Sequence, residues 1–111
     1  MSKQIQFTKT GSPDVLQIVD VAVPAPKAHE VQIQIHAIGL NRAEMMYREG
    51  AYVIDPVFPA TLGYEGAGVV TAIGDGVSEF AIGDKVSVIP SFMFTEYGTY
   101  GELVNMPVHA V

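Results

Sequence analysis

The chain has 111 residues, which is enough for one domain with a modest hydrophobic core. Twelve acidic against six basic side chains give a net charge of -6, which opposes binding to the phosphate backbone of a nucleic acid. The chain has no cysteine, and this excludes disulfide bonds and thiol catalysis and fits a reducing compartment.

The N-terminus shows no targeting or membrane segment. It carries Lys3 and Lys9 but no apolar run that would serve as a signal peptide, and no stretch approaches the length of a transmembrane helix. We therefore expect a cytoplasmic protein that has neither nucleic acid nor a membrane as its partner.

Most of the chain has the pattern of short β-strands separated by turns. In four segments apolar residues alternate with polar ones, at the period of two that a half-buried strand requires. These are Ile5 with Phe7, Leu16 with Ile18, Val31 with Ile33 and Ile35, and Val86 with Val88. The segment Pro24-Ala25-Pro26 is predicted to be extended and to connect two strands, because proline disfavours helix in the residue before it.

One short helix is predicted over about residues 42–49. Asn41 has a side chain suited to the N-cap, and Glu44 stands at the capping-box position three residues later. Gly50 stands where a left-handed residue ends many helices. On these grounds alone Asn41 is a helix cap, and no further role is required of it.

The glycine-rich stretches do not indicate a nucleotide-binding loop. Gly63, Gly66 and Gly68 follow the order G-x-x-G-x-G, the reverse of the dinucleotide fingerprint. The run from Gly74 to Gly76 lacks a third glycine, and neither run opens an amphipathic helix. We expect the first run to permit close backbone packing in a strand and the second to form a turn.

The stretch from Phe92 to Tyr97 is rich in aromatic residues and methionine and is predicted to be a loop. In a longer protein this loop could lie against a second domain or wall a substrate cleft. In the 111-residue chain alone we expect it to be an exposed apolar patch. The three histidines are too scattered to form a metal set, and His36, on the polar phase of its strand, is expected to be exposed.

Three segments stand out by their order and spacing. They are Gly39-Leu40-Asn41-Arg42-Ala43-Glu44, then Leu62-Gly63-Tyr64-Glu65-Gly66-Ala67-Gly68-Val69-Val70, and then Ile82-Gly83-Asp84-Lys85-Val86. Together they resemble the catalytic-domain half of the medium-chain dehydrogenase/reductase family, and within it the zinc-free quinone oxidoreductases. The resemblance implies a mainly β fold for residues 1–111, a single GroES-like, partly open β-barrel domain with one or two short helices. It also implies a Rossmann domain, to which nothing in this chain is similar, so we expect little or no turnover from the chain alone.

The same resemblance bears on metal binding. Zinc-dependent members carry a cysteine and a histidine as zinc ligands at the positions of Asn41 and Tyr64. An amide and a phenol are poor ligands for Zn²⁺, which takes thiolate, imidazole or carboxylate. A second zinc site of the family uses four closely spaced cysteines, which this chain lacks. We therefore expect no metal.

The resemblance further implies which residues form the active site. Zinc-free members often carry asparagine at the position of Asn41, facing the nicotinamide, and the tyrosine of their G-x-Y segment, here Tyr52, lines the cleft. We expect Tyr52 and Asn41 to be catalytic, as donors to the substrate oxygen, and Asn41 and Arg42 to contact NADP(H), which is bound mainly by the second domain. The substrate pocket is expected to include Tyr47, Tyr64 and Phe92.

Several alternatives stay open. Asn41 can cap the helix and face the cofactor at once, since its amide oxygen and NH₂ group are separate. Tyr52 can instead be an amphipathic side chain at the edge of the core beside Phe58. Relatives carry a second tyrosine at the place of Met46, and Tyr47 does not replace it, because a helix turns about 100° per residue. Glu65 is expected to be a partly buried carboxylate that bonds to backbone or to Arg42.

Function remains open at the level of the acceptor. The resemblance implies hydride transfer from NADPH to a quinone or an α,β-unsaturated carbonyl, in intact proteins that are usually homo-oligomers. An enoyl or alkenal reductase would use the same donor and barrel. A non-enzymatic GroES-like module resembling the co-chaperonin is the third reading, but the connection around residues 8–13 is shorter than a co-chaperonin's mobile loop.

Overall fold

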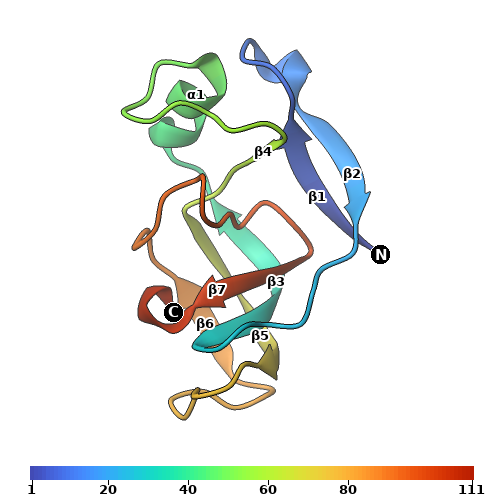
Figure 1. Cartoon of the computed structure of the whole chain (residues 1–111), viewed down its shortest axis with the longest axis vertical. Helices are drawn as coiled ribbons and strands as arrows, with labels where there is room; N and C mark the ends of the chain where they lie inside the picture. The colour runs from blue at the N-terminus through green and yellow to red at the C-terminus, as the bar shows by residue number, and fades with distance from the viewer.

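The computed structural model describes residues 1–111 as two antiparallel β-sheets and one α-helix (Figure 1). The three-stranded sheet has the order β2-β1-β4, formed by Gln17–Val21, Ser2–Phe7 and Ala60–Thr61. The four-stranded sheet has the order β6-β5-β3-β7, formed by Lys85–Val88, Glu65–Ile73, Glu30–Gly39 and Leu103–Pro107. Helix α1 spans Arg42–Glu49, and short 3-10 turns span Pro13–Val15 and Val108–Ala110.

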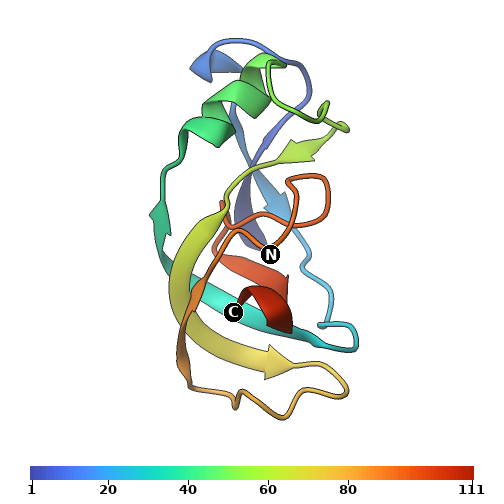
Figure 2. The same ribbon diagram turned by 90° about the vertical axis from the view of Figure 1, so that its left-hand side faces the viewer.

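The mainly β, partly open architecture is confirmed. Figures 1 and 2 show the β1–β2 ribbon standing beside the four-stranded sheet, with α1 above that sheet and next to the upper end of the ribbon, and no closed barrel. The segment before β7 joins the two sheets, because the Ile5 N–H donates to the Tyr100 carbonyl at 2.9 Å and the Glu102 N–H donates to the Lys3 carbonyl at 3.0 Å. No helix of the chain has the length and apolar character needed to cross a lipid bilayer.

Three of the four predicted strands have the predicted inward phase. Phe7, Val31 and Ile33 are fully buried, and Val88 is 3% exposed. The phase predicted for β2 is wrong, since Ile18 is 73% exposed. The reason is that Leu16 lies at the end of the 3-10 turn, outside the strand, so it does not set the alternation of β2. The half-buried positions of β2 are among its later residues, and Ile18 is not one of them.

Helix α1 has the predicted bounds and the predicted ends. The Glu44 carboxylate accepts the Asn41 backbone N–H at 2.6 Å, and Gly50 ends the helix with a φ of 77°. Arg48 fixes the helix to the connection between β1 and β2, because its Nε donates to the Gly11 carbonyl at 3.0 Å and its own carbonyl accepts the Gly11 N–H.

The glycines of β5 permit the close packing that their spacing predicted. A Cβ atom on Gly68 would lie 1.9 Å from the carbonyl oxygen of Gln34 on β3, so a side chain cannot be accommodated there. Gly76 has a φ of 79° in the turn between β5 and β6, and this confirms the second glycine run as a turn.

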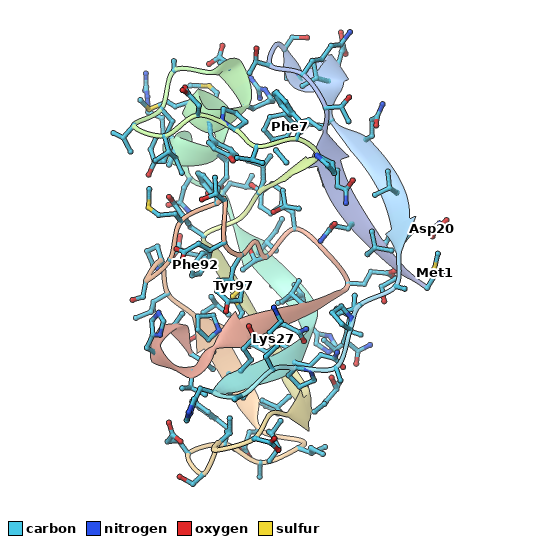
Figure 3. The ribbon with its side chains drawn as sticks, viewed as in Figure 1. Met1, Phe7, Asp20, Lys27, Phe92 and Tyr97 are labelled. Carbon is cyan, nitrogen blue, oxygen red and sulfur yellow. The ribbon has the colours of Figure 1, made fainter.

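The phenylalanine rings of the loop from Phe92 to Tyr97 are buried within the chain, and the predicted exposed apolar patch is wrong. Phe92 is 7% exposed and Phe94 is 2% exposed. The loop crosses the middle of the molecule between α1 and β7, so its rings enter the core (Figures 1 and 3). The Tyr97 hydroxyl anchors the end of this loop by donating to Glu30 Oε2 at 2.6 Å. Large apolar side chains are exposed elsewhere, among them Leu40, Val53 and Val57.

Candidate functional site

Two tyrosine hydroxyls form the chemical centre of the site. Tyr52 lies in the loop after α1, and Tyr64 lies immediately before β5. Their hydroxyl oxygens are 3.0 Å apart, a hydrogen bond in which either group can donate. We call Tyr52 and Tyr64 the tyrosine pair. Tyr52 is half-buried and Tyr64 is 7% exposed, so the pair lies at the edge of the core.

Aromatic rings surround the tyrosine pair and fix its position. The Tyr64 ring stacks on Phe94 with centroids 3.8 Å apart and an interplanar angle of 12°, and Phe92 meets Tyr64 edge-on at 5.7 Å. Tyr47 packs behind Phe94 and Tyr52, at centroid distances of 4.8 and 6.3 Å. We call these five residues the aromatic cluster; it joins α1, the loop after it, the start of β5 and the loop before β7.

Tyr47 has a place in this cluster that differs from that of the other tyrosines. It is fully buried, and its hydroxyl has no hydrogen-bond partner. Burial raises the pKa of the Tyr47 phenol. The residue therefore supports the inner wall of the cluster.

Tyr64 of the tyrosine pair keeps its proton in neutral solution. Burial, and after it the hydrogen bond with Tyr52, raises the pKa of the Tyr64 phenol. The charge of Glu44 adds to this effect. A phenol that keeps its proton is a hydrogen-bond donor, so the pair can present a proton to a negatively charged oxygen.

We expect the chain to lose stability in alkali, because several tyrosines have a higher pKa in the folded chain than in the unfolded chain. For Tyr97, burial and the bond to Glu30 raise the pKa from 10.0 to about 12. Such a group stabilises the fold fully below its unfolded pKa, and this contribution is lost as the pH rises through the folded pKa. The free energy of unfolding should therefore fall between pH 10 and pH 12.

Urea unfolding at several pH values, followed with tyrosinate absorbance, measures this loss. The Tyr97→Phe variant lacks one of the shifted groups, so its decline should be less steep than that of the wild type. A free energy of unfolding that stays constant across the same interval would contradict the assignment.

Asn41 is held at the N-terminus of α1 by two carboxylates. Its backbone N–H donates to Glu44 Oε1, and its Nδ2 donates to Glu65 Oε2 at 2.8 Å. Glu65 is exposed, and its carboxylate bonds the Asn41 side chain. The expectation of a partly buried carboxylate that bonds to backbone or to Arg42 is therefore wrong. The reason is the strand register, which pairs Glu65 with Gly39, two residues before Asn41. Arg42 is exposed.

The residues at the former zinc-ligand positions do not fit a metal. The Asn41 amide group donates to Glu65, and the Tyr64 ring is stacked on Phe94. No group of three or more His, Cys, Asp or Glu side chains is close enough to hold an ion. The three main surface grooves are lined by other residues and include neither member of the tyrosine pair.

Sequence reasoning did not place Phe94 or Met93 next to Tyr64, and it named Glu44 only as a helix-capping residue. Phe94 stacks on Tyr64, Met93 places its sulfur 3.9 Å from the Tyr64 hydroxyl, and Glu44 is a 5% exposed carboxylate whose Oε2 has no partner. The aromatic composition of residues 92–97 was the available signal for Phe94. No pattern in the sequence indicated the contact of Met93.

Residues 27–111 match the family model of the alcohol dehydrogenase GroES-like domain. The chain belongs to this family. A quinone oxidoreductase of Salmonella typhimurium is 39% identical over 106 residues, which are 96% of this chain and 31% of that protein. The GroES-like domain described here is thus an N-terminal domain of the quinone-oxidoreductase-like part of the medium-chain dehydrogenase/reductase family.

Solved structures agree with this assignment. A human synaptic vesicle membrane protein VAT-1 homolog-like protein has a TM-score of 0.87 and 31% identity, over 98% of this chain and 34% of that chain. The Escherichia coli quinone oxidoreductase complexed with NADPH has a TM-score of 0.81 and 34% identity, over 94% of this chain and 30% of that chain. The GroES-like domain therefore spans about a third of the length of the proteins it matches.

Proposed function

We propose that the chain is the substrate-side domain of a zinc-independent, NADPH-dependent reductase that transfers a hydride to a quinone or an α,β-unsaturated carbonyl. The observation that carries this proposal is the tyrosine pair, two hydroxyls 3.0 Å apart at the edge of the aromatic cluster. The similarity to quinone oxidoreductases, one of them complexed with NADPH, supports it.

The tyrosine pair suits the charge that develops in such a reduction. A bound nicotinamide supplies the hydride. The acceptor oxygen then gains negative charge, which hydrogen-bond donors stabilise most when they are fixed in place beforehand. When Tyr64 donates to Tyr52, the Tyr52 proton is free to point at this oxygen. Tyr52 is therefore proposed as the principal donor, with Asn41 as the second.

The aromatic cluster suits a flat acceptor. We propose that Tyr64 and Phe92 contact the ring or double bond of the substrate, and that Tyr47 supports them from within. Both contact residues are only 7% exposed, so any contact with the substrate is confined to the small part of each residue that reaches the surface. Edge-to-face contact with a conjugated substrate is a favourable arrangement for aromatic rings.

We propose that the cofactor meets this domain at its nicotinamide end, through Asn41 and Arg42, while the rest of it is bound outside this chain. The N-terminus of α1 carries Glu44 and Glu65, which bond Asn41. Two carboxylates repel phosphate groups, so the cofactor phosphates are not expected at this helix terminus. Arg42 is exposed and remains available to the cofactor. We also propose that the intact protein is located in the cytoplasm and forms a homo-oligomer.

NADPH oxidation by the intact protein tests the proposal. We expect turnover with 1,4-benzoquinone, 9,10-phenanthrenequinone or 2-hexenal that persists under a metal chelator, and no stoichiometric zinc in the purified protein. Catalysis here needs donors and no Lewis acid, so the chelator should have no effect. The preferred acceptor separates a quinone reductase from an alkenal reductase. Loss of turnover on chelation would contradict the zinc-independent mechanism, and no turnover with any acceptor would contradict the function.

A further inference from the structure

Met93 has its sulfur next to the tyrosine pair. Its Sδ lies 3.9 Å from the Tyr64 hydroxyl oxygen, and because a thioether is a weak acceptor the Tyr64 proton is left for the stronger bond to Tyr52 at 3.0 Å. The loop holds the residue in place, because the Met93 N–H donates to Glu96 Oε1 at 3.0 Å and the Met93 carbonyl accepts the Glu96 N–H at 2.8 Å. The residue is half-buried, so a small molecule can reach it from solvent.

The other methionines differ from Met93 in exposure or in contact. Met1 is 88% exposed, Met45 is 39% exposed, and Met106 is fully buried in β7. Met46 in α1 is half-buried, as Met93 is, but only Met93 has its sulfur next to a hydroxyl. The other methionines therefore serve as internal controls, because their oxidation can be compared with that of Met93 in the same sample.

We propose that Met93 is a site of reversible oxidation that controls the tyrosine pair; this inference rests on the proposed function. Hydrogen peroxide transfers one oxygen atom to Sδ, so the sulfur is oxidised by two electrons and the peroxide is reduced to water. The product is methionine sulfoxide, whose oxygen is a much stronger hydrogen-bond acceptor than a thioether. With the sulfur already 3.9 Å from the Tyr64 oxygen, the new oxygen lies within hydrogen-bond reach of that hydroxyl.

The sulfoxide reverses the direction of the hydrogen bond within the pair. Tyr64 then donates its proton to the sulfoxide, so its oxygen accepts the proton of Tyr52. The lone pairs of Tyr52, and no longer its proton, face the substrate oxygen. A lone pair opposes the negative charge that forms there during reduction, and turnover falls.

The proposed reaction can itself supply the oxidant. Two-electron reduction of a quinone gives a hydroquinone, and a hydroquinone that reacts with dioxygen returns the quinone and yields hydrogen peroxide. When every hydroquinone is reoxidised in this way, each turnover consumes one NADPH and produces one hydrogen peroxide near the site. Oxidation of Met93 slows that cycle, and methionine sulfoxide reductases reverse the modification.

Treatment of the intact protein with dilute hydrogen peroxide tests the inference, with each methionine followed by peptide mass spectrometry. We expect Met1 and Met45 to oxidise first, Met46 and Met93 next and Met106 last. Once Met93 is oxidised, kcat should fall by roughly 100-fold, the factor expected when the Tyr52 donor is lost. Methionine sulfoxide reductase should restore it.

Met93→Leu is the matched control, since leucine has a similar volume and no sulfur to oxidise. Its turnover should survive the same treatment. Equal loss of turnover in Met93→Leu and wild type, or full turnover with Met93 oxidised, would overturn the role of Met93. Inactivity of the untreated wild type would instead overturn the proposed function. The two failures are therefore distinguishable, because untreated turnover is measured first.

Discussion

Replacing Tyr52 by phenylalanine in the intact protein is expected to lower kcat by roughly 100-fold, the usual effect of removing one donor to a developing negative oxygen. The ring of Tyr52 packs on Tyr47 and Phe94 at 6.3 and 5.6 Å, and phenylalanine keeps both contacts. The KM for NADPH should be nearly unchanged, because the hydroxyl is proposed to act on the acceptor and not on the cofactor. Steady-state kinetics with a quinone measure both constants.

Tyr97→Phe is the control for this substitution. It removes a tyrosine hydroxyl from a different loop, the one before β7, where Tyr97 bonds Glu30 and has no place in the tyrosine pair. It should lower stability, because Glu30 Oε2 loses its partner, and leave kcat close to the wild-type value. If Tyr52→Phe also keeps the wild-type kcat, Tyr52 has no role in the reaction.

Replacing Phe94 by alanine is expected to lower the free energy of unfolding by about 3–5 kcal/mol, the usual cost of emptying a buried aromatic site. Phe94 is 2% exposed and contacts three rings of the aromatic cluster. Tyr64 loses its stacking partner at the same time, so the tyrosine pair loses its fixed geometry. Urea unfolding of the wild type and the variant measures the difference.

Phe58→Ala is the matched control for Phe94→Ala. The substitution is the same, but Phe58 is 46% exposed and its ring meets only Phe7, at 6.0 Å. Its cost should therefore be much smaller, since less apolar surface is lost from the core. Equal costs for the two variants would mean that the loop from Phe92 to Tyr97 is not part of the core.

The helix and the turns could be predicted from the sequence because their signals are local. Asn41, Glu44 and Gly50 define α1 through bonds to neighbours within a few residues. The phase of β2 and the burial of Phe94 depend on partners that are far away in the sequence. An apolar loop has the same composition whether its rings are buried in the core of their own domain or cover another domain. Composition therefore could not predict whether Phe94 is buried.

The resemblance named both tyrosines of the pair but not the bonds between the residues of the site, nor the contacts of Met93 and Phe94 with Tyr64. The resemblance pointed to Asn41, Tyr52 and Tyr64, and the structure brings Tyr52 and Tyr64 within hydrogen-bond distance. The resemblance did not indicate that Asn41 would donate to Glu65, because that contact follows from the register of β3 against β5. A register is fixed by the whole sheet, and no single motif contains it.

The hydrogen bonds between β1 and the segment before β7 have a consequence for how the site comes into being. Ile5 and Lys3 lie near one end of the chain, and Tyr100 and Glu102 lie near the other. Contacts between distant parts of a chain form late and slow its folding. The same segment carries the loop that seats Phe94 on Tyr64, so the donor pair is assembled only after the two ends have met. Local fraying of β1 would therefore be felt at the tyrosine pair, all the more because Phe7 of that strand packs on Tyr47 of the aromatic cluster.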